Sequence, residues 1–153
     1  MPNPDNTLML RVVTPSGTVI EQPTISVALW TALGEIEVLP GHAPTVVLLE
    51  PGEMRMREPS GVERAFAAGE GFARIEAGSV TVFSDMAEDA DDIALDQAEE
   101  AKSRAESAIA QAANLSDDER YAADLALRES LVKIQMTVRR KERGLGRGPA
   151  PHQ

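Results

Sequence analysis

The sequence predicts an all-β sandwich in residues 1–88, an all-α helical hairpin in residues 89–143 and a disordered tail in residues 144–153. In the first part, short β-prone segments recur between glycines and prolines, at a spacing typical of a sandwich or barrel rather than of βαβ units. Residues 86–113 contain no Gly or Pro and are rich in Ala, Glu and other strong helix formers. The tail repeats Gly and Pro, which is typical of disordered segments.

A two-residue period marks the predicted strands that have one face on a core. It is found at residues 8–13, 25–29, 35–38 and 54–58. Residues 46–49 are instead a continuous apolar run, so we expect a strand that is covered on both faces. Shorter β-prone runs complete the set at residues 19–20, 62–66, 73–76 and 80–83. Turns are indicated at Pro15–Gly17, Pro51–Gly52, Pro59–Gly61 and Ala77–Ser79.

Aromatic residues are scarce, so each one that is buried contributes a large share of the core area. We expect Phe66, Phe72 and Phe83 to lie in the core. Trp30 stands in a loop-like segment, residues 30–34, before a predicted strand. The sequence leaves open whether Trp30 belongs to the core or to a contact surface, where exposed tryptophan is favoured.

Residues 34–44, GEIEVLPGHAP, read as a strand followed by a rigid corner. Pro40 and Pro44 each fix φ and lack a backbone donor, while Gly41 permits a crowded backbone. His42 therefore lies at the tip of a shaped turn. Taken alone, such a turn could simply connect two strands.

The C-terminal part predicts two antiparallel helices. The apolar stripe of the first helix consists mostly of small residues, chiefly alanines. Ser116 and Glu119 form an S-x-x-E capping box that starts the second helix. The stripe of the second helix contains Ala123, Leu127, Leu131, Ile134 and Val138, broadened by Tyr121 and Leu125. Because alanine buries little area, we expect the hairpin to be marginally stable and able to open.

Composition excludes several classes of protein. The 153 residues, 42% of them hydrophobic, can bury one modest core but do not suit a large enzyme domain. The formal net charge of −10 argues against a nucleic-acid partner. There is no cysteine, no basic and apolar leader, and no apolar run of bilayer length. We therefore expect a soluble chain whose membrane association comes only through a partner.

No set of residues predicts catalysis or metal binding. The two histidines are His42 and His152, and the second lies in the tail, so neither a histidine triad nor a histidine metal site is expected. The acidic run of Asp89, Asp91 and Asp92 lacks the glycine and distal glutamate of a calcium loop. It fits the solvated start of a helix.

Several motifs together resemble the epsilon subunit of F-type ATP synthases. The central one is residues 34–44, preceded by Val13–Gly17 and followed by Pro51–Gly52. Residues 66–72 resemble the Gly-Gly-Phe segment of that family, with Glu70 between the glycines. Residues 80–85 resemble the strand that closes its sandwich, and residues 95–106 its first C-terminal helix. The resemblance covers about residues 8–143, with one departure in the central motif, where the family commonly has Gly and this chain has Glu37.

The resemblance implies a non-catalytic rotor subunit without a cofactor. In that family the sandwich joins the gamma subunit to the ring of c subunits, so that rotation of the ring turns the shaft. The implied location is peripheral, on the cytoplasmic face of the bacterial inner membrane. The subunit-interface residues that we expect are Glu35, Pro40, Gly41, His42 and Trp30.

The resemblance also implies two possible properties of the helices. In the family the second helix can extend between the catalytic alpha and beta subunits and block rotation in the hydrolytic direction. The matching contacts here would be Arg128, Lys133, Arg139, Arg140 and Lys141, although cations near a helix C-terminus also have a simple dipole explanation. Some relatives bind ATP through an I/L-D-x-x-R-A motif. Residues 95–100 read LDQAEE, with an acid in place of the arginine, so we expect no ATP binding.

The residues alone leave a second interpretation open. A free-standing β-sandwich could bind a peptide or sugar and use its helices as a dimerisation arm. This module would form a stable soluble oligomer and would not associate with an ATP synthase. An enzyme is a more distant third interpretation, which turnover of a nucleotide by the isolated chain would indicate.

Overall fold

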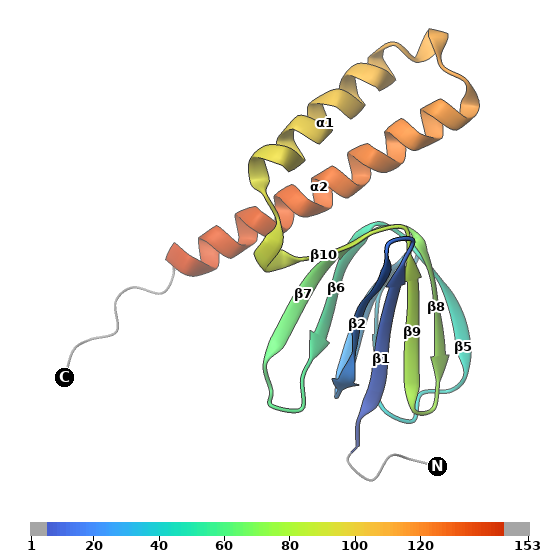
Figure 1. Ribbon diagram of the computed structural model, residues 1–153, viewed down its shortest axis with the longest axis vertical. Coiled ribbons are helices and arrows are strands. Elements are labelled where there is room, and N and C mark those ends of the chain that lie inside the picture. The colour runs from blue at the N-terminus through green and yellow to red at the C-terminus, as the bar shows by residue number, and fades with distance from the viewer. Residues whose placement is uncertain (1–5, 146–153) are drawn as a thin grey trace, which may run out of the picture. The chain divides into compact units, whose positions relative to one another are not determined.

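The computed structural model describes residues 6–145 (Figure 1). The chain divides into two compact units, Met1–Asp92 and Ile93–Gln153. The first is built of strands and the second of two long helices, which confirms the predicted order of an all-β part followed by an all-α part. Residues 146–153, most of the segment predicted as a disordered tail, lie outside the described residues.

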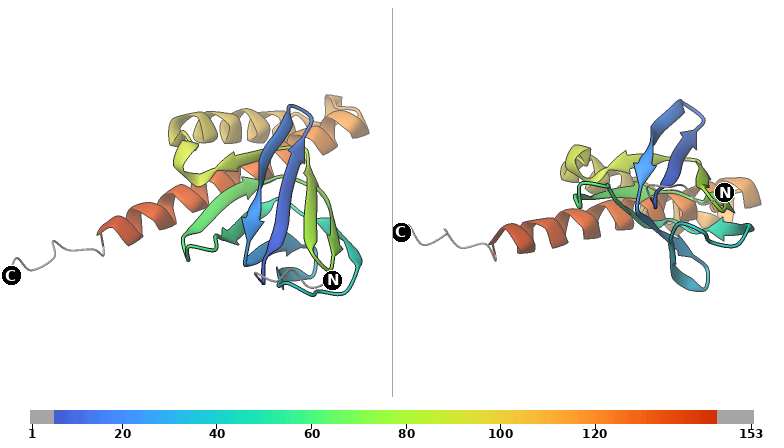
Figure 2. Two further views of the ribbon diagram at one scale, coloured as in Figure 1. Left: turned by 60° about the horizontal axis from the view of Figure 1, so that its bottom comes forward. Right: turned by 90° about the horizontal axis from the view of Figure 1, so that it is seen from below.

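The described strands form one ten-stranded sheet. They are β1 (Leu8–Thr14), β2 (Gly17–Thr24), β3 (Ser26–Thr31), β4 (Gly34–Val38), β5 (Thr45–Leu49), β6 (Gly52–Arg57), β7 (Glu63–Ala68), β8 (Gly71–Glu76), β9 (Ser79–Ser84) and β10 (Ala87–Asp89). Their order is β10-β7-β6-β3-β5-β8-β9-β1-β2, with β4 paired to β3. Only the β1–β9 pair is parallel among these strands. The sheet curves around a common core, as Figure 2 shows.

The core is aliphatic and comes from alternate residues of the strands. Leu8, Leu10 and Val12 of β1 are fully buried, while Met9 and Arg11 between them are exposed. The same alternation buries Met54 and Met56 of β6 and Ile75 of β8. The two-residue period in the sequence therefore places these strands correctly, because a pleated strand sends successive side chains to opposite faces.

Three expectations about apolar residues in the sandwich are wrong. Phe66 is buried, but Phe72 is 43% exposed and Phe83 is only partly buried. The run 46–49 is not covered on both faces, since Val46 and Leu48 are 63% and 76% exposed. Trp30 lies in strand β3 rather than in a loop, and only two residues separate β3 from β4. For the two phenylalanines and for residues 46–49, apolar character alone does not reveal which face of a strand the side chain occupies.

The end of the sandwich extends beyond the expected boundary at residue 88. Residues predicted as a helix start instead form β10, which pairs with β7, and a short 3-10 helix, Ala90–Asp92. Asp89 fixes this segment because it accepts a 2.9 Å bond from the Arg64 guanidinium and another from the Asp91 N–H. Arg64 also lies 5.2 Å from the ring centroid of Phe66. The acidic run is thus held at the edge of the sheet, because Arg64, which is distant in sequence, binds Asp89.

Two helices make up the second unit: α1 (Leu95–Ala110) and α2 (Asp117–Leu145), joined through a short 3-10 helix, Ala112–Asn114. Figure 1 shows them side by side as an antiparallel pair. Ala98 and Ala105 of α1 are buried, and so are Ser130 and Met136 of α2. The small-residue stripe of α1 is therefore confirmed. Tyr121 and Val138, which the sequence pattern places on the apolar stripe of α2, are instead 54% and 45% exposed.

The predicted capping box at the start of α2 is confirmed. The Ser116 N–H donates to a Glu119 carboxylate oxygen at 2.8 Å, and the Glu119 N–H donates to the Ser116 hydroxyl at 3.2 Å. The Ser116 backbone bond, and then its hydroxyl, hold the pKa of the Glu119 carboxyl below its usual range. Because that folded pKa is lowered, the cap is fully formed above the unfolded pKa and is lost as pH falls through the folded value.

Candidate subunit interfaces of the sandwich

One outer face of the sandwich carries a row of apolar side chains. Strand register places Leu48 of β5 beside Phe72 of β8, Phe72 beside Phe83 of β9, and Phe83 beside Val13 of β1. The rings of Phe72 and Phe83 are stacked, with centroids 4.8 Å apart. Val46, one outward position along β5, extends the row. We call these five residues the apolar face.

The apolar face has the anatomy of a contact surface. Single exposed apolar residues are normal on a protein, whereas a contiguous apolar patch across four strands is typical of a binding surface. In the neighbouring row, Arg74 lies beside Val46 and Thr81, and Arg11 lies beside Thr81, so polar side chains border the patch. An apolar centre with a polar rim is the usual organisation of a protein–protein interface.

The turn between β4 and β5 leads directly into this face. Gly41 has a φ of +84°, and its N–H donates to the Ala77 carbonyl in the β8–β9 turn at 2.9 Å. His42 Nδ1 lies 2.7 Å from the Ala43 carbonyl oxygen. Because a carbonyl oxygen can only accept, this nitrogen carries the proton. The His42 side chain is therefore held by the backbone of the turn, and the turn itself is held by a hydrogen bond to the β8–β9 hairpin.

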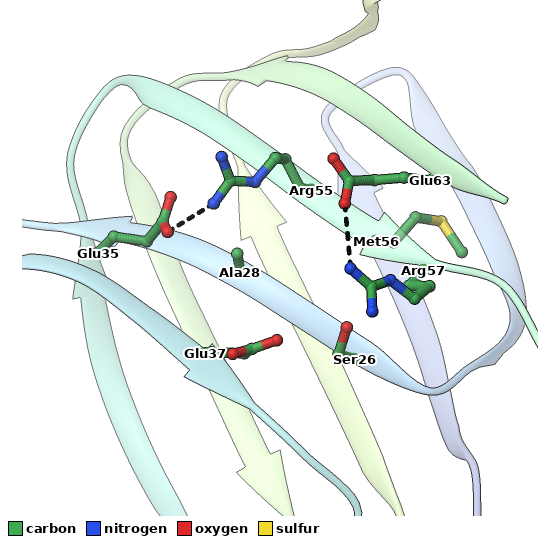
Figure 3. Close-up of a pocket in the computed structure, with 8 residues that line it drawn as sticks. All are labelled: Ser26, Ala28, Glu35, Glu37, Arg55, Met56, Arg57 and Glu63. Carbon is green, nitrogen blue, oxygen red and sulfur yellow. Dashed lines mark hydrogen bonds and ion pairs between the residues drawn. The ribbon is translucent and has the colours of Figure 1, made fainter. Parts of the chain in front are cut away.

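A second outer surface, on β3, β4, β6 and β7, is charged (Figure 3). Its floor is Ser26 and Ala28 of β3, because register places Ala28 between Glu37 of β4 and Arg55 of β6. The small floor residues leave a depression between longer charged side chains on either side. The residues that line this charged trough are Ser26, Ala28, Glu35, Glu37, Arg55, Met56, Arg57 and Glu63.

Two ion pairs join residues that line the charged trough. Arg55 donates to Glu35 at 2.6 Å, and Arg57 lies 3.5 Å from Glu63. All four side chains are partly exposed, so these pairs contribute little to stability. The two pairs hold positive and negative side chains in fixed positions on one surface, and such a pattern suits recognition of a polar partner.

Comparison with known proteins identifies the family. Residues 7–90 match the family model of the ATP synthase delta/epsilon chain β-sandwich domain. The chain is 34% identical over 131 residues to the ATP synthase epsilon chain of an Exiguobacterium species, covering 86% of this chain and 96% of that one.

The chain belongs to the ATP synthase epsilon chain family.

Other relatives agree with this assignment. The epsilon chain of Staphylococcus saprophyticus is 42% identical over 103 residues, which cover 67% of this chain and 76% of the relative. A chain in the structure of the Euglena gracilis mitochondrial ATP synthase, OSCP/F1/c-ring, superposes with a TM-score of 0.69 at 21% identity. It covers 83% of this chain and 79% of that chain. The resemblance found in the sequence motifs is therefore confirmed, and the structural match shows the same fold.

The five predicted interface residues lie at two different places on the sandwich. Glu35 lines the charged trough, and Trp30 is its register partner on β3. Pro40, Gly41 and His42 lie beyond the other end of β4, in the turn that leads to the apolar face. Sequence reasoning does not select the residues of the apolar face itself. The one signal for them is the unbroken apolar run 46–49, which fits a buried strand equally well.

The predicted inhibitory contacts all lie on α2. Arg128 pairs with Asp124 one turn before it, at 3.2 Å, and Lys133 is partly buried. Arg139, Arg140 and Lys141 are exposed near the C-terminal end of the helix. Cations there are also stabilised by the helix dipole.

The start of α1 carries the acids expected there. Asp96, Glu99 and Glu100 share one surface with Arg104. Among the described residues, no cluster of His, Cys, Asp or Glu could hold a metal ion. No described helix is both long enough and apolar enough to cross a bilayer.

Proposed function

We propose that this chain is a non-catalytic rotor subunit of a proton-translocating ATP synthase, in which the sandwich clamps the gamma subunit to the ring of c subunits. The observation that carries this proposal is the presence of two unlike contact surfaces on one rigid domain. A subunit that transmits torque must hold two partners at once without deforming between them. It works peripherally, at the cytoplasmic face of the bacterial inner membrane, through these partners.

The apolar face is the surface for the gamma subunit. A contact that bears torque must not slip, and burial of apolar area contributes about 25 cal/mol for each Å² removed from water. Leu48 and Val46 are more than half exposed in the isolated chain, so they have area to bury. The proline turn with His42 adjoins this face and belongs to the same contact.

The charged trough is the surface for the c-ring. The end of a membrane ring that projects into water presents polar loops, and polar loops are recognised by matched charges rather than by an apolar patch. Glu35 and Trp30 are the predicted interface residues that lie on this side. Together the two surfaces would couple the ring of c subunits to the gamma subunit through a stiff sheet.

Co-purification tests the proposed function directly. We expect an N-terminally tagged chain, expressed in its own cell, to retain the gamma and c subunits through detergent extraction of the membrane. The rival interpretation is a free-standing binding module with a helical dimerisation arm, which predicts a soluble oligomer. Recovery of that oligomer without any ATP synthase subunit would refute the rotor assignment.

We further propose that α2 acts as a brake on ATP hydrolysis. The hairpin is held partly through alanines such as Ala98 and Ala105, which bury little area, so α2 can leave α1 at modest cost. Its exposed cations, Arg139, Arg140 and Lys141, would then meet acidic surfaces of the catalytic alpha and beta subunits.

Deletion of residues 115–153 is expected to raise the rate of ATP hydrolysis by membrane-bound synthase and to leave assembly intact. Neutralising the exposed cations with Arg139→Gln and Arg140→Gln should raise hydrolysis in the same direction while keeping α2 present. A matched change on α1, Arg104→Gln, should have no effect. If hydrolysis by the deletion variant equals that of the complete chain, α2 is not a brake.

A further inference from the structure

An arginine on β7 contacts both end strands of the sheet. Arg64 precedes the buried Phe66 by two residues, so strand alternation places both side chains on the inner face. Its Nη2 donates to Asp89 of β10 at 2.9 Å, and its Nη1 donates to Gln22 of β2 at 3.4 Å. Nη1 also lies 3.9 Å from the Glu58 carboxylate. We call these four polar residues, Arg64, Asp89, Gln22 and Glu58, the clasp.

One role of the clasp is to close a seam in the sandwich. Strands β10 and β2 stand at the two ends of the strand order, and among the described strands no backbone pairing joins β2 to β7 or β10. Gln22 donates to Glu58 at 3.3 Å and accepts from Arg64. Side chains of the clasp therefore connect two sheet edges that the backbone leaves apart.

The second role of the clasp concerns the last residues of the sandwich. Strand β10 follows the edge of β7 (Figure 1). One carboxylate oxygen of Asp89 accepts from Arg64, and the other accepts from the Asp91 N–H at 2.9 Å. Through this one carboxylate, the arginine orients the short 3-10 helix Ala90–Asp92.

The residues just before this segment have anchors of their own. The Ser84 hydroxyl donates to the Met86 carbonyl at 2.6 Å and accepts from the Gly69 N–H at 3.0 Å. Ala87 packs against the hydrophobic core. The arginine therefore adds a hold on residues 89–92 that is separate from the anchors of residues 84–87.

The clasp bears on the length of the link between the two units of the chain. The first unit ends at Asp92 and α1 begins at Leu95. Residues 93 and 94 belong to no helix or strand, and Ala94 gives no side-chain cap to α1. A link of these two residues spans at most about 7 Å, whereas a link of residues 89–94 would span at most about 20 Å.

We propose that the clasp is a conformational device that keeps this link short when it is closed and adds residues 89–92 to the link when it opens. The inference does not depend on which partners bind the sandwich. Opening removes little apolar area from the core, because none of residues 89–92 is buried. The Arg64 side chain is 36% exposed, so water can replace its hydrogen bonds.

Hydrogen–deuterium exchange of the complete chain tests whether the clasp holds this segment. In the Arg64→Gln variant, we expect residues 88–94 to exchange about fivefold faster, because a charge-assisted hydrogen bond is lost at a partly exposed site. Strands β5 and β8 should exchange at an unchanged rate, which would show that the sandwich stays folded. Unchanged exchange of residues 88–94 would overturn the proposal.

Two further variants make this result specific. Arg57→Gln removes the cation of another ion pair, 3.5 Å from Glu63 on the same sheet, and should leave residues 88–94 unchanged. Asp89→Ala should speed exchange of residues 88–94 but not of β2, whereas Arg64→Gln should speed exchange of both. If Arg57→Gln acts as strongly as Arg64→Gln, the effect is a general one of charge and the clasp is refuted.

The length of the link is tested by spin labels, because the chain contains no cysteine of its own. Val62→Cys and Ser103→Cys place one label on the exposed β6–β7 turn and one on an exposed position of α1. Adding Arg64→Gln should widen the distribution of distances between the labels about twofold, since the span of a flexible link grows with the square root of its length. Adding Arg57→Gln should leave the width unchanged. Faster exchange with an unchanged width would show that the clasp does not set the link, and the proposal would fail.

Discussion

Replacement of Leu48 by Asp is expected to weaken binding of this chain to the gamma subunit strongly while leaving the sandwich folded. Leu48 is 76% exposed on the free chain and stands beside the stacked pair of Phe72 and Phe83. If this face is buried against gamma, the new carboxylate is buried without a partner. An uncompensated buried charge costs about 3 kcal/mol or more, which weakens binding by roughly 100-fold.

Titration calorimetry of the chain with a gamma-containing subcomplex measures this effect. The free Leu48→Asp variant should unfold at the same urea concentration as the original chain, because exposed substitutions change stability by only about 0.5 kcal/mol. Val62→Asp introduces the same charge at an exposed apolar residue of the β6–β7 turn, and its affinity should be unchanged. Tight binding by Leu48→Asp would show that the apolar face is not the gamma contact.

Alternation along the strands is sufficient to predict the sandwich, because the rule that relates sequence to burial there is local. Leu8, Leu10 and Val12 point inward at every second residue, and all of them are buried in the folded chain. The capping box at Ser116 is also local, since its two hydrogen bonds join residues three apart. These features need no knowledge of distant parts of the chain.

The apolar face could not be predicted by the same reasoning. The segment Val46–Val47–Leu48–Leu49 contains only apolar residues. A strand that is buried on both faces and a strand that binds a partner protein with one face can have the same apolar sequence. Only the folded structure distinguishes the exposed Leu48 from the buried Leu49. Phe72 and Phe83 present the same ambiguity, because aromatic residues supply area equally to cores and to interfaces.

The boundary between sandwich and helices depends on a contact distant in sequence. Asp89, Asp91 and Asp92 have the composition of a helix start, and a local prediction follows that composition. In the folded chain, Arg64 of β7 binds Asp89 at 2.9 Å and the backbone of β10 pairs with β7. Neither partner is visible in the local pattern, so the helix begins later, at Leu95.

Replacement of Gly71 by Ala is expected to destabilise the sandwich strongly, because the site is closed by backbone rather than by movable side chains. Gly71 starts β8 and pairs with Ser84 of β9. A Cβ atom at this position would overlap the Phe83 carbonyl oxygen and would lie 2.9 Å from the Phe83 carbonyl carbon. Overpacking of this kind typically costs about 1–3 kcal/mol, and more where the neighbour cannot move.

The same clash links stability to the proposed interface, because relief requires β9 to move away at the residue that stacks on Phe72. Fluorescence of Trp30, the single tryptophan of the chain, follows unfolding of the sandwich in urea. Gly78→Ala is the matched control, since nothing lies within 4 Å of a Cβ there, and its midpoint should stay close to that of the original chain. A Gly71→Ala variant that unfolds at an unchanged midpoint would mean that β8 and β9 can separate freely. The stacked pair would then be too loosely held to transmit torque.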